Sequence, residues 1–475
     1  MGDSVFWKTK NPSVLGWINF HFGRINEFLL VAEDVKKELK YLLFYLNEYI
    51  SNMTNSRRSK NKEFYKFIIA SFLIGALCTL LGEVLKMLTE NYESDLFLLA
   101  QSHWLYFFLF PLTGLSLIYL LRNFLFKKKE NKGIKEILES LKSRHNELPV
   151  YKISSHFING LITVAFGGSS GIEVSAVVAS ASIGSVTQKK AGIHNLYRKE
   201  LICAGVAAAV TVLFSSPWAG ALFALEVILK KASKRALISV LISVLTVSLI
   251  SWWLDAKPIF HVVADHWNYK AFPYFILLGI IAGLNSAYLT KCVLFFKSKF
   301  SLIIKTHRKI MLGSLLIGFC LLVFPQLYGD GYRAMKLVFG HSQQFTLTLS
   351  FFFVLFGLVV LKPIVTSLTL ASGGDGGVFA PSLFIGAFLG LLLALILNKF
   401  FHADVIPLNF MVIGMGAVLS ASLHAPFTAV FLVCGIVNNY SIVIPLLTAC
   451  FVAKMIAKMI VPYTVYSHSN ASVVK

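Results

Sequence analysis

Two glycine-rich segments carry the residue types in this chain that are best suited to chemistry. Residues 167–184 read GGSSGIEVSAVVASASIG, and residues 373–390 read GGDGGVFAPSLFIGAFLG. Each segment breaks the backbone directly before an apolar run that predicts a helix. The first amides of a helix have no partner within it, and the helix dipole makes that end positive. Each break therefore predicts an anion site built from backbone N–H groups.

Glu173 is the one acidic residue of the first segment. A carboxylate at this place would compete with a bound anion for the same amides, and protonation would release it, so Glu173 is a candidate gate. The alternative is a glutamic acid neutralised in a buried hydrogen-bond network, although ionisable groups inside a membrane are usually functional. The matching position of the second segment holds Phe379, where we expect backbone amides to bind and the ring only to pack. Pro381 suits the first helical turn, where its missing N–H does no harm.

The two segments belong to an internal repeat. At a constant offset of 206 residues, Gly167, Gly168, Gly171 and Gly184 coincide with Gly373, Gly374, Gly377 and Gly390. A second echo follows at an offset of 209, where Gly205 coincides with Gly414 and Pro217 with Pro426. Repeated halves in a membrane protein predict two structural repeats with the substrate between them near the bilayer midplane. These residues alone leave the relative orientation of the two halves open.

Composition places the elements that position these residues in a bilayer. Of the 475 residues, 56% are hydrophobic and only 14% charged. Apolar runs close to the roughly 20 residues that cross a bilayer recur along the chain, as at 67–88, 104–121, 274–289 and 350–365. The sequence thus predicts an all-α, multi-pass membrane protein. The net charge of +21 comes from basic clusters between these runs, which favours a positive-inside pattern with both termini cytoplasmic and argues against nucleic-acid binding.

Four parts are predicted along the chain. Residues 1–63 form a cytoplasmic segment with an amphipathic helix over 25–50, residues 64–255 a first membrane repeat, and residues 271–461 a second. Residues 462–475 begin a C-terminal helix that carries Tyr466. The six cysteines lie in apolar stretches without a CxxC pair, so we expect no metal site, and nothing in the sequence indicates a cofactor.

These motifs resemble, over nearly the whole membrane region, the CLC family of chloride channels and chloride/proton exchangers. Residues 167–184 are similar to the family's GREGP element, with Glu173 as its gating glutamate, and residues 377–381 match its GxFxP element. NKGIK at 131–135 lies where the family has GSGIP, and Tyr466 corresponds to the tyrosine whose hydroxyl faces the central anion. The resemblance implies a homodimer in a lipid bilayer, with one pathway per subunit and two inverted repeats of tilted and broken helices.

The resemblance also implies how chloride or another small anion is held. Backbone amides and one hydroxyl would bind it, from Lys132, Gly133, Ile134, Gly171, Ile172, Gly377, Val378, Phe379, Ala380 and Tyr466.

Three departures from the family pattern bear on this mechanism. GREGP has become GIEVS, which keeps the glutamate but loses the arginine and the proline. Lys132 replaces the serine of GSGIP, and its ammonium group either attracts anions at the inner mouth or extends to the cytoplasm. Val227 stands where exchangers carry an inner proton-relay glutamate, and valine cannot carry a proton. The sequence therefore predicts channel-like conduction, voltage- or pH-gated by Glu173, whereas Glu226 is interpreted as structural.

Three other activities are compatible with parts of the sequence. A chloride/proton or fluoride/proton antiporter is the main alternative, because some exchangers lack the inner glutamate and the fluoride branch also departs from both motifs. Residues 168–171 fit the GxSG motif of rhomboid-like intramembrane serine proteases, with His424 as the available base. A chain with so many apolar segments and an internal repeat does not need that chemistry. A cation or neutral-solute transporter would place acidic or carbonyl groups at the breaks. We therefore predict that the protein is not an enzyme.

Overall fold

The computed structural model describes residues 59–468, apart from 127–128, 130, 143–146, 231–232, 257–258, 261–266 and 341–344. The chain forms two units, residues 1–62 and 63–475, and the second of these is described below. The amphipathic helix predicted over 25–50 lies outside the described residues.

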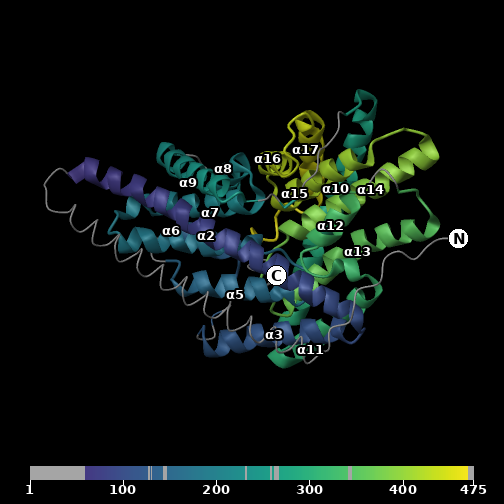
Figure 1. Ribbon diagram of the computed structural model, residues 1–475, viewed down its shortest axis with the longest axis horizontal. Coiled ribbons are helices and arrows are strands. Elements are labelled where there is room, and N and C mark those ends of the chain that lie inside the picture. The colour runs from purple at the N-terminus through teal and green to yellow at the C-terminus, as the bar shows by residue number, and fades with distance from the viewer. Residues whose placement is uncertain are drawn as a thin grey trace. The chain divides into compact units, whose positions relative to one another are not determined.

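The described part of the chain is built from helices (Figure 1). The helices of the first half are α2 (Ser59–Ser102), α3 (Tyr106–Phe124), α4 (Ile134–Lys142), α5 (Tyr151–Ala165), α6 (Glu173–Lys190), η1 (Asn195–Tyr197), α7 (Arg198–Phe214), α8 (Pro217–Leu222), η2 (Phe223–Leu229) and α9 (Lys234–Trp253). Those of the second half are η3 (Tyr269–Ala271), α10 (Phe272–Ser301), α11 (Thr306–Val323), η4 (Pro325–Leu327), α12 (Tyr332–Phe339), α13 (Leu349–Ala371), α14 (Phe379–Phe401), α15 (Pro407–Leu423), α16 (Pro426–Ile436) and α17 (Val443–Ile460).

Eight helices of the described residues are long and apolar enough to cross a membrane. The four apolar runs noted in the sequence fall on α2, α3, α10 and α13, which are among the eight. Helices α6, α7, α14 and α15 are almost entirely buried, and α14 is 94% buried over its most apolar window. They form the core, while the helices around them expose large apolar side chains.

The internal repeat predicted from the sequence is visible as two equivalent helix crossings, α6 with α7 (teal in Figure 1) and α14 with α15 (green to yellow). A Cβ built on Gly184 would lie 2.3 Å from the Leu201 carbonyl oxygen, and one built on Gly390 would lie 2.0 Å from that of Phe410. A Cβ on Gly205 would lie 2.2 Å from the Ser180 carbonyl, and one on Gly414 would lie 2.2 Å from that of Gly386. All four contacts coincide at the offsets of 206 and 209 residues, so the echo in the sequence is a repeat in space.

Both helix breaks are made in the same way. Helix α5 ends at Ala165 and is followed by Gly167, where φ is +82°. Helix α13 ends at Ala371 and is followed by Gly373, where φ is +108°. The next N–H donates back to the helix in each case, from Gly168 to the Thr163 carbonyl at 2.8 Å and from Gly374 to the Thr369 carbonyl at 2.9 Å. A positive φ favours glycine, so both breaks are glycine-terminated helix ends. It turns the chain so that α6 and α14 can begin a few residues later.

Candidate anion site

The two broken segments meet backbone to backbone. Gly171 and Gly377 exchange two hydrogen bonds, each with an N to O distance of 3.1 Å, and form an isolated antiparallel bridge. Helix α6 begins at Glu173 and α14 at Phe379, each two residues after the bridge. The geometry therefore places the positive ends of the two helices side by side, as the sequence predicted.

The Glu173 carboxylate lies at this meeting point and is 1% exposed. Its Oε2 folds back over Gly171, because a Cβ built there would be only 1.8 Å from that oxygen. The carboxylate also interacts with the amides of Glu173 itself and of Ala380, and among the described residues Oε2 has no hydrogen-bond partner. Its Oε1 accepts a hydrogen bond from the Tyr332 hydroxyl at 2.5 Å. The carboxylate thus occupies the space in front of the α14 amides.

The second half contributes backbone and hydroxyl groups to the same place. The Val378 N–H donates to the Tyr466 hydroxyl oxygen at 3.2 Å. The Phe379 ring is fully buried and packs against Phe223, with ring centroids 5.3 Å apart. The structure therefore brings Val378, Tyr466, Gly171 and Glu173 together, and the Phe379 side chain packs away from polar groups.

Tyr466 lies in a turn bounded by Thr464 and Ser467. The Thr464 N–H donates to the Ser467 hydroxyl at 2.9 Å, and the Ser467 N–H donates back to the Thr464 hydroxyl at 3.2 Å. Such reciprocal bonds form the capping box found where helices begin. The described residues end at His468, so the predicted C-terminal helix stays a prediction.

Helix α4 starts close to α6. Gly133 has φ of +63°, and a Cβ on it would lie 3.2 Å from a Val174 methyl group. Ile134 is fully buried. The Lys132 N–H is taken by the Glu136 carboxylate, while its side chain is 60% exposed with Nζ 3.9 Å from Glu139. In this arrangement the Lys132 ammonium group extends outward rather than toward Glu173.

Glu136 fixes the loop before α4. Its carboxylate also contacts the Lys152 ammonium group at 2.8 Å and His156 Nε2 at 3.3 Å. Burial raises the pKa of Glu136, but the hydrogen bonds and charges of His156 and Lys152 outweigh it and hold the pKa at about 2. The depressed value means that the ionised form stabilises the folded protein.

Replacing Glu136 with glutamine is expected to lower the free energy of unfolding by about 1–3 kcal/mol at neutral pH, because the Lys152 ammonium group loses a buried ionised partner. The wild-type advantage is present above the ordinary glutamate pKa of 4.5 and is lost as the pH falls toward about 2, where Glu136 itself protonates. Unfolding in detergent over this pH range measures it. Glu139→Gln, at a side chain 42% exposed, is the control and should change little. A constant difference down to acidic pH would contradict this assignment.

A basic cavity of about 520 Å³ opens beside the site, lined by Gly377, Val378 and Tyr466. Its basic side chains are Arg122, Lys132, Lys135, Lys297 and Lys309. The charge of Asp375 in its wall is compensated by Arg122, which donates to one carboxylate oxygen at 2.8 Å. Asn131 donates to the other oxygen at 2.6 Å. The cavity therefore carries an excess of basic side chains in front of the helix ends.

The residues considered for a proton relay or for protease chemistry are Val227, Ser170 and His424. Val227 is on η2, and the neighbouring Glu226 accepts hydrogen bonds from the Thr428 N–H at 2.9 Å and hydroxyl at 2.7 Å, so Glu226 caps α16. The Ser170 hydroxyl of the GxSG motif donates to the Asp375 carbonyl at 3.2 Å, and His424 ends α15 with φ of +57°. The hydrogen bond of Ser170 and the backbone turn at His424 give these two residues structural roles.

Apolar spanning helices, paired helix breaks and a basic cavity where the breaks meet define an all-α, multi-pass membrane protein of the anion-transport class. The chain belongs to the CLC family, since the family model described as voltage gated chloride channel matches residues 113–458, most of its length. Membership confirms the resemblance inferred from the motifs. The activity is CLC-type chloride transport, not enzymatic catalysis.

The chain is similar to curated members and to solved structures. It is 27% identical over 372 residues to a putative chloride channel protein ClcB-like of Ralstonia nicotianae, covering 76% of this chain and 83% of the relative. It is 26% identical over 316 residues to the voltage-gated ClC-type chloride channel ClcB of Escherichia coli, covering 66% and 74%.

The X-ray structure of a slow cyanobacterial Cl⁻/H⁺ antiporter matches with a TM-score of 0.73 at 22% identity, over 84% of this chain and 96% of that one. A CLC-type fluoride/proton antiporter matches at 0.70 and 23%, over 87% and 98%. These structural matches confirm the predicted fold class.

Proposed function

We propose that this protein conducts chloride passively and that the Glu173 carboxylate is its voltage- or pH-dependent gate. The observation that carries the proposal is the position of this carboxylate between the starts of α6 and α14, over Gly171 and beside the Ala380 amide. An anion that binds there must displace it. Protonation removes the charge that competes for the amides, so acidic conditions open the pathway.

The anion would pass from the basic cavity to the helix ends. Backbone groups offer the positive ends of two helix dipoles there without a fixed cation, which holds a halide without trapping it. We assign this role to the amides of Gly133, Ile134, Ile172, Phe379 and Ala380 and to the Tyr466 hydroxyl. The N–H groups of Gly171 and Gly377 bond each other's carbonyls and that of Val378 bonds Tyr466, so we assign these three residues to shaping the site. Because the Lys132 N–H is already bonded to Glu136, we assign Lys132 only a charge at the cavity mouth.

Passive conduction rests on Val227. This residue occupies the inner relay position, and the adjacent carboxylate of Glu226 is engaged by Thr428. No protonatable side chain therefore stands at the relay position itself. Coupled antiport of chloride or fluoride with protons is the second candidate, supported by the similarity to two structures described as antiporters.

Purified protein in liposomes, with chloride, fluoride and proton movements recorded together, tests the proposal. We expect a chloride gradient to drive chloride flux without moving protons in a fixed ratio. Proton uptake against its own gradient, driven by chloride or by fluoride, would replace the channel with the corresponding antiporter.

We also propose a homodimer with both termini cytoplasmic. Large apolar side chains are exposed on helices that could face a partner or lipid, including Trp218 of α8, Leu249 of α9, Phe427 of α16 and Met459 of α17. A bilayer and a partner helix cover such surfaces equally well, so the proposal relies on the family resemblance. Sedimentation of the protein in detergent tests the subunit number, and a monomer would contradict it.

A further inference from the structure

Tyr332 is the side chain that holds the Glu173 carboxylate. Its hydroxyl donates to Glu173 Oε1 at 2.5 Å, and both residues are buried, with 6% and 1% of their surfaces exposed. The second oxygen of the carboxylate lies over Gly171. One oxygen is therefore fixed by α12 while the other covers the space where the helix ends meet.

The position of the Tyr332 hydroxyl is fixed by its own neighbours. The Asp330 carboxylate accepts a hydrogen bond from the Tyr332 N–H at 2.8 Å. Gly331 between them has φ of +90°, and a Cβ there would lie 2.4 Å from the Phe384 ring. The Tyr332 ring packs edge-on against Phe260, with centroids 5.4 Å apart. The hydroxyl consequently has little freedom to leave Glu173 by moving alone.

Lys362 stabilises the loop that leads into α12 and Tyr332. This lysine is fully buried in the apolar helix α13, and its Nζ donates to the Gly329 carbonyl at 3.1 Å and the Leu327 carbonyl at 3.4 Å. The ammonium group also lies 4.6 Å from the centre of the Phe384 ring. A buried cation is retained only when such partners compensate for lost hydration. The loop before α12 is thus built around a fixed charge.

Buried charges surround the contact between Glu173 and Tyr332. Lys362 interacts electrostatically with Asp330, Glu93 and Glu173. Four groups face Glu173: Tyr332 and Asp330 at the start of α12, Lys362 of α13, and Tyr466 of the C-terminal segment. Glu93 of α2 in turn faces Tyr332 and Asp330. The protonation of Glu173 therefore responds to a defined set of neighbours.

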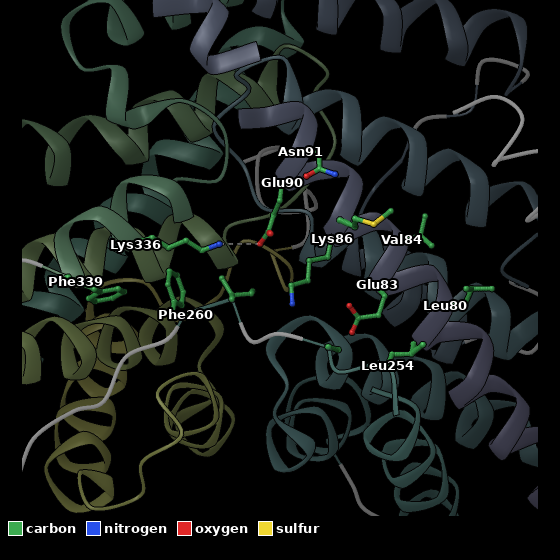
Figure 2. A pocket seen from close by; sticks show the side chains of 14 residues that line it. Leu80, Glu83, Val84, Lys86, Glu90, Asn91, Leu254, Phe260, Lys336 and Phe339 are labelled. Atoms are coloured by element: carbon green, nitrogen blue, oxygen red, sulfur yellow. Dashed lines mark hydrogen bonds and ion pairs between the residues drawn. The ribbon is translucent and has the colours of Figure 1, made fainter. Parts of the chain in front are cut away.

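A second cavity reaches close to this cluster (Figure 2). It has a volume of about 810 Å³ and lies between α2, the segment around residue 260 and the end of α12. Figure 2 shows Lys336 pointing toward Glu90, with 3.3 Å between the charged atoms, and Phe260 beside Phe339. Phe260 lines this cavity and also packs on Tyr332.

We propose that Tyr332 is a latch that holds Glu173 in the anion pathway and thereby helps to determine the pH at which the pathway opens. The proposal rests on the gate role proposed for Glu173. A hydroxyl that donates to an ionised carboxylate stabilises it in that position, and protonation weakens the bond. Tyr332 is a positioning residue in this scheme, since it acts on the anion through Glu173.

Tyr332→Phe removes the latch and leaves the ring in place. We expect chloride flux into liposomes at neutral pH to rise about tenfold, and the midpoint of flux against pH to move about one unit toward alkaline pH. Tyr328→Phe is the matched control, because the Tyr328 hydroxyl is also buried in this loop region but donates to the Ala165 carbonyl at 2.8 Å. It should leave both quantities unchanged.

The same pair of measurements in a Glu173→Ala background separates a latch from a packing residue. Without the carboxylate, Tyr332→Phe should have no further effect on flux. An unchanged pH profile in Tyr332→Phe, or an equal increase in the Glu173→Ala background, overturns the latch.

If Tyr332→Phe does not fold, Glu173→Asp withdraws the carboxylate from the hydroxyl by one methylene. It should shift the pH midpoint in the same direction, and a wild-type midpoint overturns the latch. A wild-type pH profile in Glu173→Ala refutes the gate and the latch together. An altered profile in Glu173→Ala combined with a wild-type profile in the single variant Tyr332→Phe refutes the latch alone.

Discussion

Replacing Glu173 with glutamine is expected to give a chloride flux that is high and almost independent of pH. The wild-type carboxylate competes for the amides at the starts of α6 and α14 only while it is ionised, and glutamine has no charge at any pH. A hydrogen bond to a charged group contributes about 1.5–3 kcal/mol, which corresponds to an increase of about 10- to 100-fold in flux at neutral pH. The two proteins should converge at acidic pH, where the wild-type gate is protonated.

Chloride efflux from liposomes over a pH series measures this effect. Glu226→Gln is the matched control, because it makes the same change at a glutamate that caps α16 through Thr428. The amide oxygen of glutamine can still accept from the Thr428 N–H, so the wild-type pH curve should be retained. If Glu173→Gln kept that curve as well, Glu173 would be a buried structural residue and the gate would lie elsewhere.

The helix breaks could be predicted from the sequence because their causes are local. Gly167 and Gly373 are needed where φ is positive, and each is followed within six residues by a helix start. The echo at offsets of 206 and 209 works for the same reason, since Gly184 and Gly390 meet the carbonyls of Leu201 and Phe410. A packing contact that admits only glycine can therefore be recognised in the sequence as a glycine at a fixed position.

Tyr332 and Lys362 were missed because their partners are distant in the chain. Tyr332 contacts a residue 159 positions away, and in the sequence it is one of 17 tyrosines. Lys362 lies inside an apolar run that predicted a spanning helix without indicating what would compensate its charge. The signal available was the sequence GDGY at 329–332, where two glycines flank an acid between apolar segments. The residues that surround such a loop follow only from the tertiary structure.

The family resemblance implied that the Lys132 amide helps to bind the anion, and a local contact bears on that role. Glu136 lies in the first turn of α4, and its carboxylate accepts the N–H of Lys132, two residues before the helix begins. A carboxylate at this spacing from the break is readable in a sequence. It predicts that the amide of Lys132 is engaged by the protein itself.

Gly390→Ala is expected to prevent correct assembly of the core. A Cβ at this position would lie 2.0 Å from the Phe410 carbonyl oxygen, and a backbone atom of a buried helix cannot rotate away as a side chain can. Helices α14 and α15 would have to separate along their length. Overpacking of a core costs about 1–3 kcal/mol when side chains yield, so we expect a loss above about 3 kcal/mol here. Thermal unfolding in detergent and the monodisperse fraction measure it.

The repeat supplies a second test of the same contact. Gly184→Ala places a Cβ 2.3 Å from the Leu201 carbonyl in the equivalent crossing of α6 and α7, so its cost should be similar. Gly340→Ala is the control, because the nearest atom, the Leu337 carbonyl oxygen, is 4.0 Å away and the protein should fold normally. If alanine were tolerated at Gly390 but not at Gly184, the two crossings would not be mechanically equivalent. The sequence similarity between the halves would then reflect common ancestry, and the two crossings would not share the same packing requirement for glycine.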